Sequence, residues 1–132
     1  MAEKIFNKTA KEKNLPFEAT SAGLFTRTGL SMSENSQEAL TLMGIEAADF
    51  RSTSITDLDT EDFDLIVTMT PEHRDVLEGV FGVSPQKVMV LCEGTGGVAD
   101  PYGGSPARYL QCRDEIREGI DNLLERLVEN EN

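Results

Sequence analysis

The stretch DLIVTMTPEH, residues 64–73, carries the clearest indication of the fold. Its first half is a continuous apolar run, which is typical of a strand buried on both faces of a sheet. Its second half contains Thr70-Pro71-Glu72. This is a strong helix start because it combines a capping hydroxyl, a proline at the first helical position and an acid near the positive helix end. A strand that runs directly into a helix is the repeating unit of a parallel α/β fold.

Strand-like and helix-like segments alternate along the rest of the chain. The run KVMVL predicts a strand at 87–91, and the residues before the Gly23 turn predict one at 18–22. With 64–69, these strands are expected to form a parallel sheet flanked by helices on both faces, in one three-layer α/β domain spanning 1–132. Helices are predicted at 1–14, at 33–43 behind a Ser33 cap, from Thr70 to near Gly82, and from Ser105-Pro106 onward.

The last predicted helix is the longest and has a continuous apolar stripe. Cys112 lies in this stripe and is therefore expected to be a buried core thiol. The other cysteine, Cys92, lies at a strand end, and both are expected to be free thiols in a cytoplasmic chain. The stripe recurs with a period of about 3.6 residues and consists of Tyr109, Cys112, Ile116, Ile120, Leu123, Leu124 and Leu127.

The composition and charge of the chain disfavour some classes of binding partner. The chain has 24 acidic and 12 basic side chains and a formal net charge of −12, which opposes binding to nucleic acid or to an anionic membrane. No apolar run is long enough to span a bilayer, and the first residues lack the pattern of a signal peptide, so a cytoplasmic location is expected. The single histidine, His73, has no further histidine as a co-ligand, and we expect neither a metal nor a cofactor.

The loop DPYGGS at 100–105 resembles the general-acid loop of the low-molecular-weight phosphotyrosine protein phosphatases, which also precedes a long C-terminal helix. The resemblance covers essentially all 132 residues. The motifs SAG, MT-x-x-H and DPYGGS resemble the bacterial branch, which includes protein-arginine phosphatases, more than the animal enzymes. Three further segments agree with the family in order and spacing: Met1-Ala2-Glu3 with Ile5-Phe6, Ser21-Ala22-Gly23, and Leu65 to Thr70.

The resemblance implies roles for three residues. Asp100 matches the aspartic acid that donates a proton to the leaving oxygen and later takes one from water. Tyr102 would contact the substrate and partly desolvate Asp100, while Ser21 matches the serine that supports the family's phosphate loop. By itself, Asp-Pro-Tyr-Gly-Gly is also a good turn sequence, because Asp, Pro and Gly each favour turns.

The chain departs from the family at its nucleophile. The family's cysteine, in a Cys-x5-Arg-Ser loop, attacks phosphorus as a thiolate, and the arginine clamps the transition state. Here the sixth residue after Cys92 is Val98, and the sixth after Cys112 is Glu118. The resemblance therefore implies that this loop and the central first strand of the sheet are missing, and that the chain as given is an inactive, truncated member of the family.

The sequence is compatible with three functions. The first is a phosphatase whose given sequence begins too late, acting on a phosphoprotein or a small phosphoester once its loop is present. The second is a pseudo-phosphatase that serves as a binding module. The third and least favoured is an arsenate reductase of the same fold, because Cys92 and Cys112 are not placed for a disulfide relay. Loss of a central strand would expose sheet edges, so the chain is expected either to form a homo-oligomer, which is the favoured outcome, or to be markedly unstable.

Overall fold

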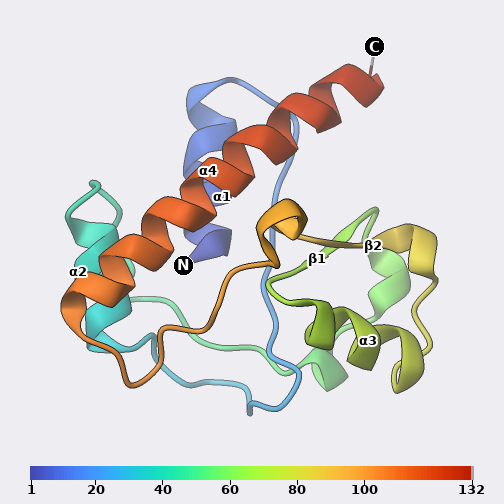
Figure 1. Cartoon of the computed structure of the whole chain (residues 1–132), viewed down its shortest axis with the longest axis horizontal. Helices are drawn as coiled ribbons and strands as arrows, with labels where there is room; N and C mark the ends of the chain where they lie inside the picture. Colours follow the sequence, from blue (N-terminus) through green and yellow to red (C-terminus); the bar gives the residue numbers. More distant parts are fainter. Residues whose placement is uncertain (132) are drawn as a thin grey trace.

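Helices and short strands alternate along the chain, as Figure 1 shows for a computed structural model that describes residues 1–131. Four short 3₁₀ turns lie between these elements, at Ile55–Asp57, Thr60–Asp62, Pro85–Lys87 and Glu93–Thr95. The helices and strands are α1 (Ala2–Glu12), α2 (Glu34–Thr41), β1 (Ile66–Thr68), α3 (Pro71–Gly79), β2 (Val88–Val90) and α4 (Pro106–Glu131).

The predicted helix starts are confirmed by their capping hydrogen bonds. The Ser33 hydroxyl accepts from the backbone N–H of Ser36 at the start of α2, and the Thr70 hydroxyl accepts from that of His73 at the start of α3. The end of α3 was predicted near Gly82, but the helix stops at Gly79. Gly82 instead adopts a positive φ of 67° in the turn that follows, a conformation that costs glycine little.

The two strands form a parallel sheet with helices on both of its faces, which confirms the predicted α/β class. β1 pairs with β2 in register, Val67 lying opposite Met89. Because successive side chains in a strand point to opposite faces, Val67 packs towards the cluster built from α1 and α4, and Ile66 towards the cluster that contains Leu77 of α3. The core therefore has a larger part on one side of the sheet and a smaller part on the other.

The predicted strand at 18–22 is wrong, because this segment does not join the sheet. Side chains of α1 form hydrogen bonds with the backbone polar groups of this segment instead. The Asn7 amide accepts from Ala19 N–H at 2.7 Å and donates to Ala19 C=O at 2.9 Å, and Glu3 accepts from Ser21 N–H at 2.7 Å. Beyond this segment, Gly23 makes only an isolated parallel bridge to Ser54. Local sequence favours an extended chain here, but its hydrogen-bond partners come from a helix.

The larger core forms where α1 and α2 pack against α4 (Figure 1). Ile5 of α1, Leu40 of α2 and Leu124 of α4 are all at most 1% exposed. The stripe predicted for α4 is confirmed: Leu127 is partly buried, and the other six residues, Tyr109, Cys112, Ile116, Ile120, Leu123 and Leu124, are buried. None of the helices within residues 1–131 combines the length and apolar character needed to cross a membrane.

We expect Asn7→Ala to lower the free energy of unfolding by about 1–3 kcal/mol, because it leaves both backbone groups of the half-buried Ala19 without their partners. Asn122→Ala is a matched control, since Asn122 is exposed on α4 and its loss should change stability by less than about 0.5 kcal/mol. Urea unfolding followed by circular dichroism measures both values. Equal effects of the two substitutions would show that Asn7 does not hold the 18–22 segment.

Candidate functional site

The segment after β2, residues 91–105, carries Asp100 from the carboxyl end of the sheet to the start of α4. In parallel α/β folds, sites form at this end of the strands. Two backbone hydrogen bonds tie the segment to the end of β1: Leu91 N–H donates to Thr68 C=O at 2.8 Å, and Val98 N–H donates to Met69 C=O at 2.6 Å. Asp100 follows only two residues after the second bond, so β1 determines where it lies.

Gly97 allows the segment to come this close to β1. It has a φ of +93°, and a Cβ atom at this position would overlap the carbonyl oxygen of Met69 and lie 3.3 Å from the Cα of Thr70. The neighbouring Gly96 also has a positive φ, of 87°, but a Cβ there would meet nothing within 4 Å. In the sequence, the GTGG run at 94–97 indicates a loop. The glycine run was the available indication, but it could not say which glycine is sterically required.

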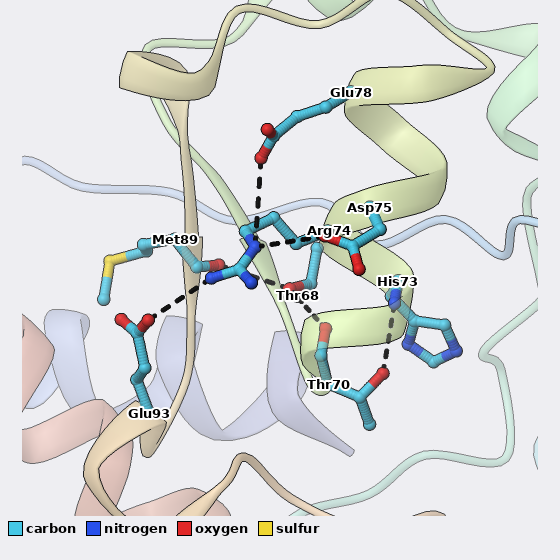
Figure 2. A network of polar contacts seen from close by, with 8 residues as sticks. All are labelled: Thr68, Thr70, His73, Arg74, Asp75, Glu78, Met89 and Glu93. Carbon is cyan, nitrogen blue, oxygen red and sulfur yellow. Dashed lines mark hydrogen bonds and ion pairs between the residues drawn. The ribbon is translucent and has the colours of Figure 1, made fainter.

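Arg74 of α3 forms a further link to the segment (Figure 2). Its Nη1 lies 3.3 Å from Oε1 of Glu93, and its Nε lies 3.6 Å from Asp75 and 3.9 Å from Glu78. The Arg74 side chain is 32% exposed and that of Glu93 is 66% exposed, so each contact contributes at most about 1 kcal/mol. The network therefore orients the Glu93–Thr95 turn and adds little to the free energy of unfolding. Sequence analysis did not identify Arg74.

Close to this ion-pair network, Thr68 links the two strands with the start of α3 (Figure 2). Its hydroxyl donates to the carbonyl of Thr70 at 3.1 Å and reaches the carbonyl of Met89 at 3.4 Å (Figure 2). Thr68 is the one buried polar residue among those described, at 7% exposure, and these contacts satisfy its hydroxyl. These contacts therefore fix the end of β1, which accepts the backbone hydrogen bonds of the 91–98 segment.

Asp100 lies in an exposed turn that leads into α4. Its Oδ1 accepts from the backbone N–H of Tyr102 at 3.0 Å, and Gly104 N–H donates to Pro101 C=O at 2.8 Å. The Tyr102 side chain is 86% exposed, and Asp100 is exposed as well. The expected desolvation of Asp100 by Tyr102 is therefore not found, because the ring points into solvent. This arrangement leaves the Asp100 carboxyl accessible to a ligand.

Ser21 lies apart from this turn in its contacts. Its hydroxyl donates to Oε1 of Glu3 at 3.0 Å, and the same oxygen accepts from the Ser21 backbone. Among the described residues, no hydrogen bond links Ser21 with Asp100 or Tyr102. The structure thus places the acid and the tyrosine in one turn, and it ties Ser21 to the first turns of α1. The partner Glu3 was not singled out from the sequence.

The two cysteines are free thiols, as predicted, and both are poorly suited to act as nucleophiles. Partial burial raises the pKa of Cys92, and the nearby carboxylates of Glu115 and Glu118 raise it further. Burial also raises the pKa of Cys112, in spite of the opposing charge of Arg108. A raised pKa keeps the thiol protonated, whereas the thiolate is the reactive form. Within residues 1–131, no cluster of three or more His, Cys, Asp or Glu side chains is suited to hold a metal ion.

The chain matches a known protein family along its length. A sequence model of the family described as "Low molecular weight phosphotyrosine protein phosphatase" matches residues 1–132. The chain belongs to this family. The resemblance of the loop DPYGGS and of the segments around it is therefore confirmed at the level of the family.

Relatives agree in sequence and in structure. The chain is 34% identical over 131 residues to a protein-arginine-phosphatase of Bacillus subtilis, covering 96% of this chain and 87% of that protein. A crystal structure of a YwlE mutant from the same organism matches with a TM-score of 0.87 at 33% identity, covering 96% of this chain and 87% of the other. A low molecular weight protein tyrosine phosphatase from T. tengcongensis matches with a TM-score of 0.86 at 32% identity, covering 95% and 88%.

We expect Gly97→Ala to destabilise the chain by about 1–3 kcal/mol more than Gly96→Ala, because only the first substitution adds an overlap with the Met69 carbonyl. Both positions have a positive φ, so the comparison separates the overlap from the backbone strain that the two share. Urea unfolding gives the difference, and amide hydrogen exchange at Val98 reports whether its bond to Met69 is lost. If the two variants behave alike, the close approach at Gly97 is not a constraint.

Proposed function

We propose that this chain has the fold of a protein phosphatase in which Asp100 acts as the general acid when a nucleophile loop is present. The observation that carries the proposal is the Asp100 turn, held at the carboxyl end of β1 by the 91–98 segment and leading directly into α4. An accessible carboxyl group there can give its proton to a leaving oxygen or nitrogen and then take one from an attacking water. The exposed Tyr102 ring, two residues on, would contact the group that carries the phosphoryl.

We further propose a phosphoprotein substrate with phosphoarginine as the favoured modified residue. The supporting observation is the 34% identity to a protein-arginine-phosphatase along nearly the whole chain. A protein-tyrosine-phosphatase, PtpB of Staphylococcus epidermidis, is 32% identical over 107 residues, which supports phosphotyrosine as the second candidate. Comparing the hydrolysis of phosphoarginine and phosphotyrosine by a form with a complete nucleophile loop distinguishes the two.

The 132 printed residues contain no Cys-x5-Arg motif, and the pKa of each of the two thiols is raised. We therefore expect no turnover of p-nitrophenyl phosphate by this chain above the background rate. Removing a nucleophile together with its phosphate-binding loop costs several powers of ten in rate. The measurement is a phosphate-release assay on the purified chain, with Asp100→Ala as the paired sample. Turnover that disappears in Asp100→Ala would contradict this expectation.

A complementary form tests the role of Asp100 itself. Placing a strand and a Cys-x5-Arg-Ser loop ahead of Met1 is expected to produce phosphatase activity. In that form, Asp100→Asn should lower turnover of substrates with poor leaving groups far more than of those with good ones, because a good leaving group needs little protonation. Equal losses for both kinds of substrate would remove Asp100 from the role of general acid.

The second candidate function is a pseudo-phosphatase that binds phosphorylated partners without hydrolysing them. The observation that favours it is an intact Asp100 turn in a sequence without the nucleophile motif. The form with the restored loop separates the two functions. If it gains activity, the family's catalytic machinery is otherwise complete. If it stays inactive but the 132-residue chain binds phosphopeptides, the chain is a binding module.

Self-association is the last part of the proposal. In the described part of the chain, the sheet has only two strands, and β1 pairs with β2 alone. A strand edge without a partner favours pairing with another chain. We expect sedimentation equilibrium to detect a homo-oligomer at micromolar concentration. A monomer that melts cooperatively at high temperature would show that the small sheet suffices by itself.

A further inference from the structure

An open groove of about 320 Å³ lies between the end of α1 and the last turns of α4. Its floor is apolar: Leu124 is 1% exposed, and Leu15 and Val128 are half-buried. In Figure 1 the last turns of α4 project beyond the segment that follows α1, so this end of the helix has less cover than its middle. The volume is at the lower end of the range for ligand sites, about 300–1,000 Å³. The groove has room for a few apolar side chains.

One rim of the groove is acidic. Glu125 and Glu129 are both exposed and lie four residues apart, so their carboxylates are neighbours on the helix surface. On the opposite rim lies Lys13. Within residues 1–131, no ion pair includes Lys13, Glu125 or Glu129. Like charges at this spacing weaken a helix slightly, and a cation between them would remove that cost.

The two glutamates continue a longer stripe of acidic side chains along α4. Their spacing of three or four residues places all members on one face of the helix. Asp121 is half-buried and the other members are exposed. The acidic stripe consists of Asp114, Glu118, Asp121, Glu125 and Glu129, of which Asp114 is already paired with Arg113 at 2.9 Å. With a net charge of −12 on the whole chain, this face attracts cationic partners and repels anionic ones.

The groove is remote from the Asp100 turn. Its α4 residues, from Leu124 to Glu129, lie 18 or more positions after Pro106, and at 1.5 Å per residue this is roughly 27 Å or more along the helix. A ligand confined to the groove therefore does not touch the turn that carries the proposed general acid. Binding there neither requires the proposed phosphatase activity nor follows from it.

We propose that the groove and the acidic stripe together form a docking surface for a basic amphipathic helix of a partner protein. Apolar side chains of that helix enter the groove over Leu124 and Val128, and its Lys and Arg side chains face Glu125 and Glu129. The apolar floor makes a purely polar polycation a poor ligand. A second copy of this chain is a poor occupant too, because it would bring its own acidic stripe against this one.

The experiment uses the 132-residue chain and a synthetic 18-residue helical peptide as the probe. The peptide carries leucines on one face and arginines on the other, and a scrambled peptide of the same composition is its control. Fluorescence anisotropy gives the dissociation constants. The paired substitution Glu125→Lys with Glu129→Lys is expected to weaken binding at least about tenfold, because it turns attraction into repulsion at two positions. Val128→Ser should weaken binding about fivefold by removing apolar contact.

The matched control is Glu61→Lys with Asp62→Lys. These two exposed acids lie in the Thr60–Asp62 turn, and reversing them changes the net charge by the same amount. We expect them to weaken binding by less than about threefold, as a general effect of charge. Circular dichroism establishes that all variants keep their helix content. A smaller effect of the control pair on the dissociation constant, together with weaker binding of the scrambled peptide, would support the proposal.

Four results would overturn the proposal. An equal loss in the groove pair and the control pair would mean diffuse attraction to an acidic protein. Equal affinity for the scrambled peptide would mean that no amphipathic helix is recognised. The assay extends to about 100 µM peptide, which is near the weak end of specific recognition. Absence of binding at this concentration would mean that the groove and the acidic stripe do not form a docking surface. In the fourth result, sedimentation shows a dimer of the chain that dissociates when Glu125 and Glu129 are both replaced by lysine. That result would assign the groove to a second copy of this chain.

Discussion

The apolar stripe of α4 is the contact on which the rest of the structure depends. It is buried along most of the 26-residue helix, and both α1 and α2 pack against it. Each large side chain buried there contributes about 1.5–3 kcal/mol relative to an exposed position. Arg113 adds a bond across the contact, because its Nη1 donates to the carbonyl of Ala39 in α2 at 3.0 Å. Since α4 is held in this way, its two ends have defined positions: the Asp100 turn lies at the first and the apolar groove at the second.

The small sheet has a different task, which is to place the segment that carries the acid. Two carbonyl groups at the end of β1, those of Thr68 and Met69, accept hydrogen bonds from backbone N–H groups of the 91–98 segment. Gly97 makes this approach sterically allowed, and the half-exposed pair of Arg74 and Glu93 adds orientation rather than much stability. Thus three hydrogen-bonded residues per strand are enough to position a loop, because the loop is tied to the strand by its own backbone. The Asp100 side chain itself remains exposed to solvent.

Helix α1 has a double role in this chain. Its apolar side packs on α4, while Glu3 and Asn7 hold the extended segment around Ala19 through its backbone. These bonds satisfy polar groups that would otherwise need a neighbouring strand. The chain belongs to the phosphatase family, but an acid by itself does not break a phosphorus–oxygen or phosphorus–nitrogen bond. Burial raises the pKa of both thiols, which keeps them protonated and disfavours the reactive thiolate form.

The sequence alone determined the parts of the molecule that depend on short-range patterns. The stripe of α4, the caps at Ser33 and Thr70 and the strands around Val67 and Met89 were all predicted, because periodicity and capping act within a few residues. Only the tertiary structure decided what lies beside an extended segment. Whether 18–22 pairs with a strand or with the side chains of α1, which glycine must approach β1, and whether Tyr102 covers Asp100 each depend on residues far away in the sequence. The groove also belongs to this class, since it exists only where the end of α1 meets the last turns of α4.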